Sequence, residues 1–161
     1  MRIGVLNQQS SLPIDKPSVR SVVRAFLKLE EVSCNEVSIH FIDTKETCRI
    51  HNDYFGDPTT TDCMSFPLMT FPLEDQADAY RLLGDVFVCP ETALNYTAEH
   101  GGNPYEETTL YIIHGMLHLL GYDDRKKADL KKMREAEAKH MKNLKQHNLL
   151  IQRPKVYTPL S

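Results

Sequence analysis

One segment constrains the fold of this 161-residue chain more than any other. Residues 104–120, PYEETTLYIIHGMLHLL, have helical periodicity and are apolar almost all round. A helix of this kind has to be buried, because no face of it is suited to water. Asn103, Pro104 and Glu106 fit the N-cap, first and third positions of the helix, so its start is well marked.

The periodicity of the remaining sequence predicts an alternation of strands and helices. Apolar runs and period-two alternation predict four strands, at residues 2–8, 36–43, 63–69 and 82–90. Helical spacing predicts further helices at residues 17–32, 45–55, 91–100 and 125–146. A polar, acidic connection around Glu74 to Asp78 separates the last two strands, and the tail at 153–161 is expected to be irregular. This order predicts an α/β (α+β) fold, a mixed sheet of about four strands packed with about five helices.

Length and composition narrow the class of protein. A chain of 161 residues suits one hydrophobic core, so we expect a single domain over residues 1–161. No apolar run approaches the roughly 20 residues that span a bilayer, and the N-terminus does not resemble a secretory signal. We therefore expect a soluble, cytoplasmic protein with no membrane partner. The cysteines form no CxxC pair, which indicates reduced thiols and argues against a cysteine metal site; they are Cys34, Cys48, Cys63 and Cys89.

Charge is distributed unevenly along the chain. The net charge is −3, but residues 125–155 hold eleven Lys or Arg against three acids, which gives that segment +8 and leaves −11 for the rest. A basic segment beside an acidic body is expected where one face meets a polyanion such as RNA. A solvated helix face explains the same charges equally well.

The stretch HGMLHLLGYDD, residues 114–124, carries the pattern of a metal site. His114 and His118 are four residues apart, so both imidazoles lie on one helix face and can reach one ion. Gly121 can end the helix and turn the chain, which brings Asp124 back toward the same ion. Three protein ligands leave a position for water, as in catalytic zinc sites, and a bound divalent ion lowers the pKa of that water to about 7.

A purely structural interpretation competes with this one. The two histidines could be polar residues of a buried helix, and one aspartate could cap the next helix near Arg125. Two unpaired imidazoles inside so apolar a helix would be costly, and a metal removes that cost. Spacing favours Asp124 as the third ligand and leaves capping open for Asp123.

The same segment argues against peptide hydrolysis. The zinc-protease pattern HExxHxxGxxH requires a Glu directly after the first His as general base, and Gly115 stands there instead. A metal hydrolase with another substrate is therefore favoured. Phosphodiesters are natural candidates, because a metal polarises phosphoryl oxygens and the basic segment begins beside Asp124.

At this point the residues resemble a known family. HGMLHLLGYDD is similar to the HGxLHLxGYDH signature of the YbeY endoribonucleases, and three further segments resemble that family in the right order: HNDYFG (51–56), TTDCMSFP (60–67) and LGDVFVCPETA (83–93). The resemblance implies a mixed four-stranded sheet with helices and one divalent metal ion, for which zinc is expected. It also implies single-strand-specific cleavage of RNA in small-subunit (16S) rRNA maturation and ribosome quality control, with ribosomal RNA and the small ribosomal subunit as partners.

The chain departs from the family pattern at two positions. Asp124 stands where the family has His, which weakens the selectivity for softer metals, and Phe55 stands where it has Arg. Arg49 or Arg125 could supply the missing cation, and Ser65 matches the family's cleft-lining strand together with Thr61 and Asp62. The metal ligands expected are therefore His114, His118 and Asp124, with Ser65, Arg49 and Arg125 as weaker catalytic candidates. The other five histidines have no ligand spacing, and a non-catalytic ribosome-associated protein with a structural metal is the alternative function.

Overall fold

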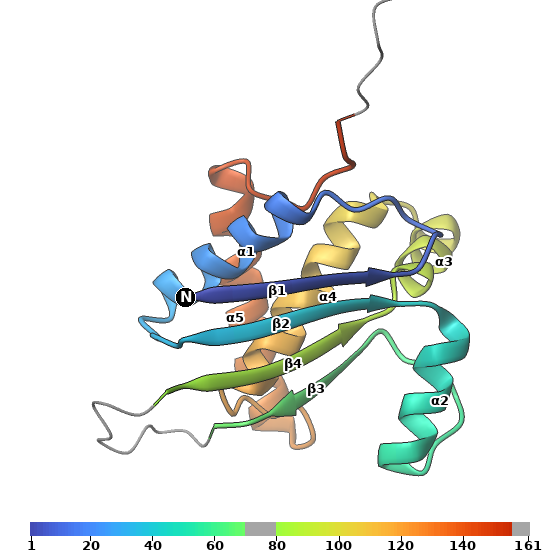
Figure 1. Cartoon of the computed structure of the whole chain (residues 1–161), viewed down its shortest axis with the longest axis horizontal. Helices are drawn as coiled ribbons and strands as arrows, with labels where there is room; N and C mark the ends of the chain where they lie inside the picture. Colours follow the sequence, from blue (N-terminus) through green and yellow to red (C-terminus); the bar gives the residue numbers. More distant parts are fainter. Residues whose placement is uncertain (70–79, 156–161) are drawn as a thin grey trace, which may run out of the picture.

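The computed structural model describes residues 1–69 and 80–155, and within them it contains four strands and five helices (Figure 1). The strands are β1 (Arg2–Gln8), β2 (Glu36–Ile42), β3 (Cys63–Pro67) and β4 (Leu82–Val88). The helices are α1 (Lys16–Leu29), α2 (Thr44–Phe55), α3 (Pro90–His100), α4 (Pro104–Leu119) and α5 (Lys127–Gln146). These bounds lie close to the expected ones. The acidic connection around Glu74 to Asp78 and the end of the tail lie outside the described residues.

The strands form one mixed sheet, so the predicted fold class is confirmed. Its order is β1-β2-β4-β3, in which β1 pairs with β2 and β2 with β4 in parallel. β3 runs antiparallel to β4, with Ser65 opposite Val86, and forms one edge of the sheet. α1 connects β1 to β2 as the helical crossover that a parallel pair requires.

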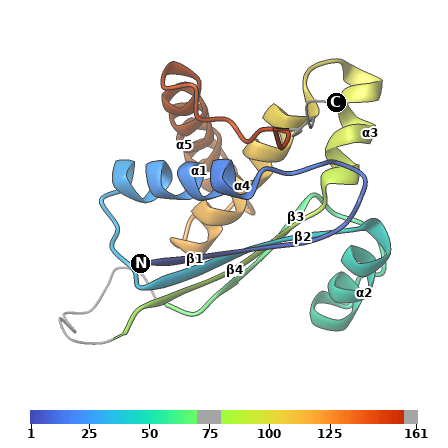
Figure 2. The same ribbon diagram turned by 45° about the horizontal axis from the view of Figure 1, so that its top comes forward.

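Helices cover the two faces of the sheet unequally. Figure 2 shows α1, α4 and α5 together on one side, whereas α2 lies beyond the other side, near one end of the strands. The core fills the space between the sheet and the three helices; among its fully buried side chains are Phe26, Ile39, Phe41, Val86, Ile112, Ile113, Met116 and Leu117. The expectation that the apolar segment at 104–120 is buried is therefore confirmed.

Gly115 sets how closely α4 approaches the sheet. A Cβ atom added at this position would lie 2.4 Å from Cγ1 of Val86 on β4, so that any other residue here would force the helix or Val86 to shift. The Ser65 hydroxyl on β3 donates a hydrogen bond of 2.8 Å to the Gly115 carbonyl oxygen. The turn of α4 between its two histidines is thus fixed against both β3 and β4.

Local sequence explains where α1 and α2 begin and end. The carboxylates of Asp15 and Asp43 accept hydrogen bonds from the backbone N–H groups of Ser18 and Glu46, which are N-cap contacts. Gly56 ends α2 with φ of 67°, a left-handed conformation that glycine adopts without strain. The last turn of α2, which carries Tyr54 and Phe55, is therefore held at a defined place.

The described residues contain neither a disulfide nor a helix that could span a membrane. All four cysteines lie in the described part of the chain, and all four are free thiols. No helix among the described residues has the length and apolar composition needed to cross a membrane.

Candidate metal centre and its cleft

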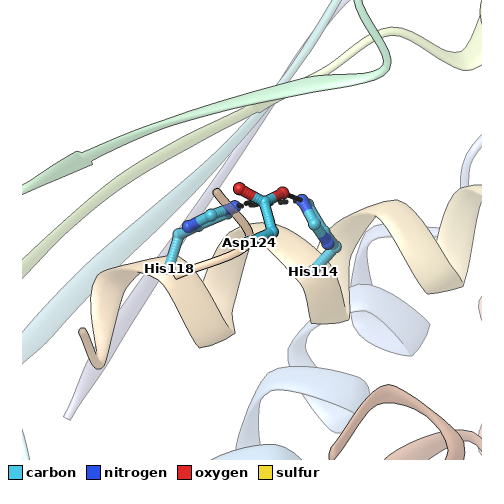
Figure 3. A group of neighbouring side chains, drawn as sticks. All are labelled: His114, His118 and Asp124. Atoms are coloured by element: carbon cyan, nitrogen blue, oxygen red, sulfur yellow. Dashed lines mark hydrogen bonds and ion pairs between the residues drawn. The ribbon is translucent and has the colours of Figure 1, made fainter. Parts of the chain in front are cut away.

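Three side chains converge beside α4, as Figure 3 shows. His114 and His118 project from the same face of the helix, and the carboxylate of Asp124 reaches back between them from the segment that follows. Asp124 Oδ2 lies 3.5 Å from His114 Nε2 and 3.4 Å from His118 Nε2, and the two Nε2 atoms are 3.0 Å apart. The structure thus brings together the three residues that the sequence singled out.

These separations match the ligand spacing of a small tetrahedral ion. With bonds of about 2.0 to 2.1 Å, neighbouring ligand atoms around tetrahedral zinc lie roughly 3.3 Å apart. The three observed separations, from 3.0 to 3.5 Å, bracket that value. The group can therefore hold one metal ion with little movement of its side chains.

The hydrogen bonds on the far side of each ring fix which nitrogen faces the other two side chains of the group. His118 Nδ1 lies 3.0 Å from the carbonyl oxygen of Tyr122, and His114 Nδ1 lies 2.8 Å from Oε1 of Glu137. Both partners accept hydrogen bonds, so both Nδ1 atoms carry the proton. In the neutral rings the two Nε2 lone pairs then face each other and the Asp124 carboxylate. Three acceptors without a donor repel one another unless a cation lies between them.

Glu137 supports His114 from a different helix. This carboxylate belongs to α5, is almost fully buried, and also accepts two hydrogen bonds from Arg134, of 2.7 and 2.8 Å. Burial raises the pKa of Glu137, but the hydrogen bonds from His114 and Arg134 outweigh it and leave that pKa below its ordinary value. Burial likewise lowers the pKa of His114, and Glu137 reverses this effect and raises it. Such a carboxylate–histidine pair orients a metal ligand and makes it more basic.

Sequence reasoning missed Glu137 and Arg134, although a signal for the first exists. Glu137 falls on the buried stripe of α5, whose members are Met133, Glu137, His140 and Leu144. A carboxylate on the apolar face of an otherwise charged helix needs a buried partner. That partner is His114, which no spacing rule connects with a residue 23 positions further along the chain.

The segment from Gly121 to Arg125 places the carboxylate of Asp124, the third side chain of the group. Gly121 has φ of 93°, the left-handed conformation expected where the chain turns back after α4. Asp123 does not cap α5, because that helix begins at Lys127 and its N-cap position is Lys126 without a side-chain cap. Instead Asp123 accepts hydrogen bonds from the backbone N–H of Asp124 and from the guanidinium of Arg125. The guanidinium of Arg125 and the backbone N–H groups of Asp124 and Arg125 lower the pKa of Asp123 to about 2.

Hollows open on both sides of His118. One, of about 310 Å³, lies between α2, β3 and α4 and is lined by His51, Phe55, Cys63, Met64, Ser65, Pro67 and His118. The other, of about 420 Å³, lies along the turn and is lined by His118, Gly121, Tyr122, Asp123, Asp124 and Arg125. We call the first of these the cleft. A substrate can therefore approach the three converging side chains from solvent.

The weaker candidates lie at different distances from this site. Ser65 lines the cleft, with its hydroxyl engaged by the Gly115 carbonyl. Arg125 lines the second hollow, 85 % of its side chain is exposed, and Asp123 binds it. Arg49 lies on the exposed side of α2, where Glu46 and Asp53 hold it, and it does not line the cleft.

Several other residues noted in the sequence have structural partners. The Asp62 carboxylate accepts a hydrogen bond from the backbone N–H of Cys63, which is turn chemistry. Asp85 pairs with His40 at 2.9 Å. His51 had no ligand spacing in the sequence, but it lines the cleft, with Nδ1 donating to the carbonyl of Thr59 at 2.7 Å. The sequence gives no signal for this position of His51, because residues of α2, β3 and α4 come to border one cleft only in the folded chain.

Two cations of the basic segment bind carboxylates at the site: Arg125 binds Asp123, and Arg134 binds Glu137. Arg134 is bound to Glu137, and its pKa is raised by that hydrogen bond and further by the charges of Asp124 and Asp62. Among the described residues, Lys145 of the same segment pairs with Glu106 on α4. The cations of residues 125–155 thus have different neighbours, and those with contacts at the site include Arg125 and Arg134.

Comparison with known proteins identifies a consistent set of relatives. Residues 4–145 match the family model described as Endoribonuclease YbeY. A protein of that name from Protochlamydia amoebophila is 44 % identical over 92 % of this chain and 97 % of its own length. Another, from Chlamydia trachomatis serovar L2, is 32 % identical over 96 % of this chain and 94 % of its own length. The fold also resembles the solution structure of a Thermotoga maritima protein, with a TM-score of 0.61, 21 % identity and 91 % coverage of both chains.

Proposed function

This chain belongs to the Endoribonuclease YbeY family, and we propose that it cleaves single-stranded RNA with a divalent metal ion held by His114, His118 and Asp124. The family gives it an endoribonuclease role and an RNA substrate. The observation that carries the metal proposal is the convergence of three ligand atoms within 4.8 Å of one another, with both Nδ1 atoms engaged elsewhere. Zinc suits two imidazole nitrogens and one carboxylate oxygen at tetrahedral spacing.

Each residue of the site has a distinct task in this mechanism. When bound, a divalent ion supplies a Lewis acid for a phosphoryl oxygen and makes a coordinated water more acidic. His114 and His118 present their Nε2 atoms, and Asp124 adds a negative charge. Glu137 accepts a hydrogen bond from Nδ1–H of His114, and the Tyr122 carbonyl accepts one from Nδ1–H of His118. These contacts orient both rings so that their Nε2 atoms face Asp124.

Gly115 supports a nuclease over a peptidase. In the zinc-protease pattern this position carries the glutamate that serves as general base. Here even a Cβ atom would collide with Val86, so the backbone position has no room for that side chain. Proton transfer has to come from another group in the cleft or from solvent.

An open coordination position separates catalysis from a purely structural metal. In the described residues, the group that can hold an ion consists of three side chains, and hollows border His118 on two sides. Structural zinc sites are closed by four protein ligands, whereas catalytic sites keep one position for water or substrate. This supports cleavage over a binding protein with a structural metal.

The biological substrate we propose is ribosomal RNA of the small subunit, cleaved during 16S maturation and quality control in the cytoplasm. The support is the set of four segments, from residue 51 to residue 124, that resemble the family signatures. The small ribosomal subunit is the corresponding partner.

Cleavage of defined RNAs tests the proposal. Purified protein is incubated with a single-stranded oligoribonucleotide and with its duplex, after chelation and after addition of zinc or manganese. We expect cleavage of the single strand only, lost on chelation, restored by metal, and absent in His114→Ala. Metal-independent cleavage, or cleavage by His114→Ala at the wild-type rate, would contradict the role of the three ligands.

A further inference from the structure

Aromatic side chains form a row from the sheet to the rim of the cleft. Phe87 on β4 stacks on His40 and meets Phe66 on β3 edge to face, at centroid separations of 4.2 and 5.6 Å. Phe66 in turn contacts Tyr54 and Phe55 in the last turn of α2, at 5.1 and 5.9 Å. These separations are those of interacting rings. We call Tyr54, Phe55 and Phe66 the aromatic cluster.

Two of these rings are open to solvent. Tyr54 is 70 % exposed and Phe55 is 56 % exposed, whereas Phe66 is half-buried beneath them. Phe66 also packs against a small apolar core of Ile42, Ile50 and Met64. The two exposed rings therefore pack on a side chain that is itself anchored in the core. Their exposed faces bury nothing within the chain and so contribute nothing to its folding.

The aromatic cluster is continuous with the cleft. Phe55 lines the cleft together with His118 and Ser65, and its ring lies 5.7 Å from that of His51, which lines it too. A molecule that occupies the cleft beside His118 therefore meets the side chain of Phe55. Tyr54 and Phe66 extend this surface away from the site.

The charge of α2 excludes phosphate binding as the reason for this surface. The two cations of the helix, Lys45 and Arg49, are balanced by Glu46 and Asp53, and Arg49 is bound to both acids. No excess positive charge attracts a phosphate here. What the surface offers is flat, apolar ring faces, which nucleobases bind by stacking whatever their sequence.

The size of the surface also favours bases over a folded partner. Stable protein interfaces bury more than about 1,000 Å² in total, whereas two exposed rings match one to three bases. Resting on the proposed nuclease function, we propose that the aromatic cluster stacks the bases next to the phosphate that is cleaved, with Phe55 holding the nearest base. Tyr54 and Phe55 are thus residues that position the substrate strand.

Leucine variants test the proposal by affinity. Phe55→Leu and Tyr54→Leu keep an apolar side chain but remove the ring, and Tyr96→Leu, at a 45 % exposed tyrosine on α3, is the matched control. Loss of one stacked base weakens binding by roughly 5- to 150-fold, so we expect at least about a fivefold loss for Phe55→Leu. Binding is measured by anisotropy on single-stranded oligoadenylate with phosphorothioate linkages, which slow cleavage. The loss should be equal at every salt concentration, because no phosphate contact is removed.

Fluorescence gives a direct signature of stacking. The chain contains no tryptophan, so Phe55→Trp introduces a single indole at the rim of the cleft. We expect oligoadenylate to quench this indole and to bind with at least wild-type affinity, whereas Tyr96→Trp should bind without quenching. An oligonucleotide with abasic sites in place of adenosines should quench neither variant.

The outcomes separate this inference from the proposed function. Quenching of the Phe55→Trp indole without RNA cleavage by the wild type would uphold stacking and reject the nuclease mechanism. Cleavage by the wild type combined with unchanged affinity and KM in Phe55→Leu would overturn stacking and leave the nuclease intact, as expected if the cluster instead docks a protein. Absence of any binding of single-stranded RNA by the wild type would overturn both.

Discussion

His114 and His118 lie one turn apart on the same face of α4, but different parts of the molecule support them. A charged side chain from α5, Glu137, fixes His114, and Arg134 fixes Glu137 in turn. The backbone carbonyl of Tyr122, in the turn that directly follows α4, fixes His118. The first support depends on the packing of two helices, and the second depends only on local chain conformation. Mutations can therefore weaken the two halves of the proposed metal site separately.

The largest effect should come from the ligands themselves. His114→Ala, His118→Ala and Asp124→Ala should each reduce bound metal from about one ion per chain to almost none, because two ligands do not hold zinc firmly. Elemental analysis of purified protein measures this. Full occupancy in Asp124→Ala together with loss in Asp123→Ala would show that the wrong aspartate was chosen.

The same variants distinguish the two supports in metal-free protein. His114→Ala leaves the buried Glu137 with one partner fewer, which should cost about 1 to 3 kcal/mol of unfolding free energy. His118→Ala frees only a backbone carbonyl in the turn and should cost less. Urea unfolding of the chelator-treated variants compares them, and equal losses would mean that Glu137 contributes no more than the turn.

Glu137→Gln should weaken only the α5 support. The amide still accepts the Nδ1 proton of His114 but lacks the negative charge, and changes of this kind typically lower metal affinity about 10- to 100-fold. Competition with a chromophoric chelator measures the affinity. Glu135→Gln, at an exposed position of the same helix, is the matched control and should bind metal as the wild type does.

Gly121→Ala should weaken only the turn support. The residue has φ of 93°, and a side chain in a left-handed conformation costs about 1 to 2 kcal/mol. Relief of this strain moves the Tyr122 carbonyl and Asp124, so metal affinity should fall by less than in Glu137→Gln. Gly56→Ala places a similar strain at the end of α2, with φ of 67°, and should leave metal affinity unchanged.

Asp124→His changes the type of the one ligand that the turn itself contributes. Imidazole favours zinc and nickel, whereas carboxylate also tolerates manganese and magnesium. The variant should therefore keep its fold and bind zinc more tightly relative to manganese. Competition titrations with the two ions measure this ratio, and an unchanged ratio would assign selectivity to geometry instead of ligand type.

The smallest effect concerns cations beside the turn. Replacing Arg125, Lys126 and Lys127 by Gln should flatten the salt dependence of RNA binding, by a log-log slope of about 0.7 for each phosphate that is no longer neutralised. Lys139, Lys142 and Lys145, at least about 18 Å further along α5 from Lys127, provide a control triple. Metal content should not change in either triple. If RNA affinity depends on salt equally in the wild type and both triple variants, the basic segment is a solvated helix face without phosphate contacts.

The sequence predicts the contacts within α4 and its following turn better than the contacts that α4 makes with distant helices. The spacing of His114 and His118 and the turn at Gly121 follow from helix geometry and glycine conformation, so the approach of Asp124 could be expected. The strands and helices were likewise evident from periodicity. The contacts of Glu137 and Arg134 depend on how α5 packs against α4, and the place of His51 depends on how α2 lies beside β3 and the end of α4. Periodicity carries no information about such packing. Asp123 was ambiguous because the same residue type serves caps and turns.

The close contact at Gly115 has a consequence for how the site moves. Because this turn of α4 lies against Val86 and is hydrogen-bonded to Ser65, it cannot open without separating the helix from the sheet. We expect the amide protons of residues 112–118 to exchange with solvent only when the whole fold opens, and those of residues 121–125 to exchange through local fluctuations. Metal release would then begin with departure of Asp124, while His114, which Glu137 on α5 holds, stays in position for rebinding. Hydrogen exchange of the metal-free protein, followed residue by residue, measures this difference in protection.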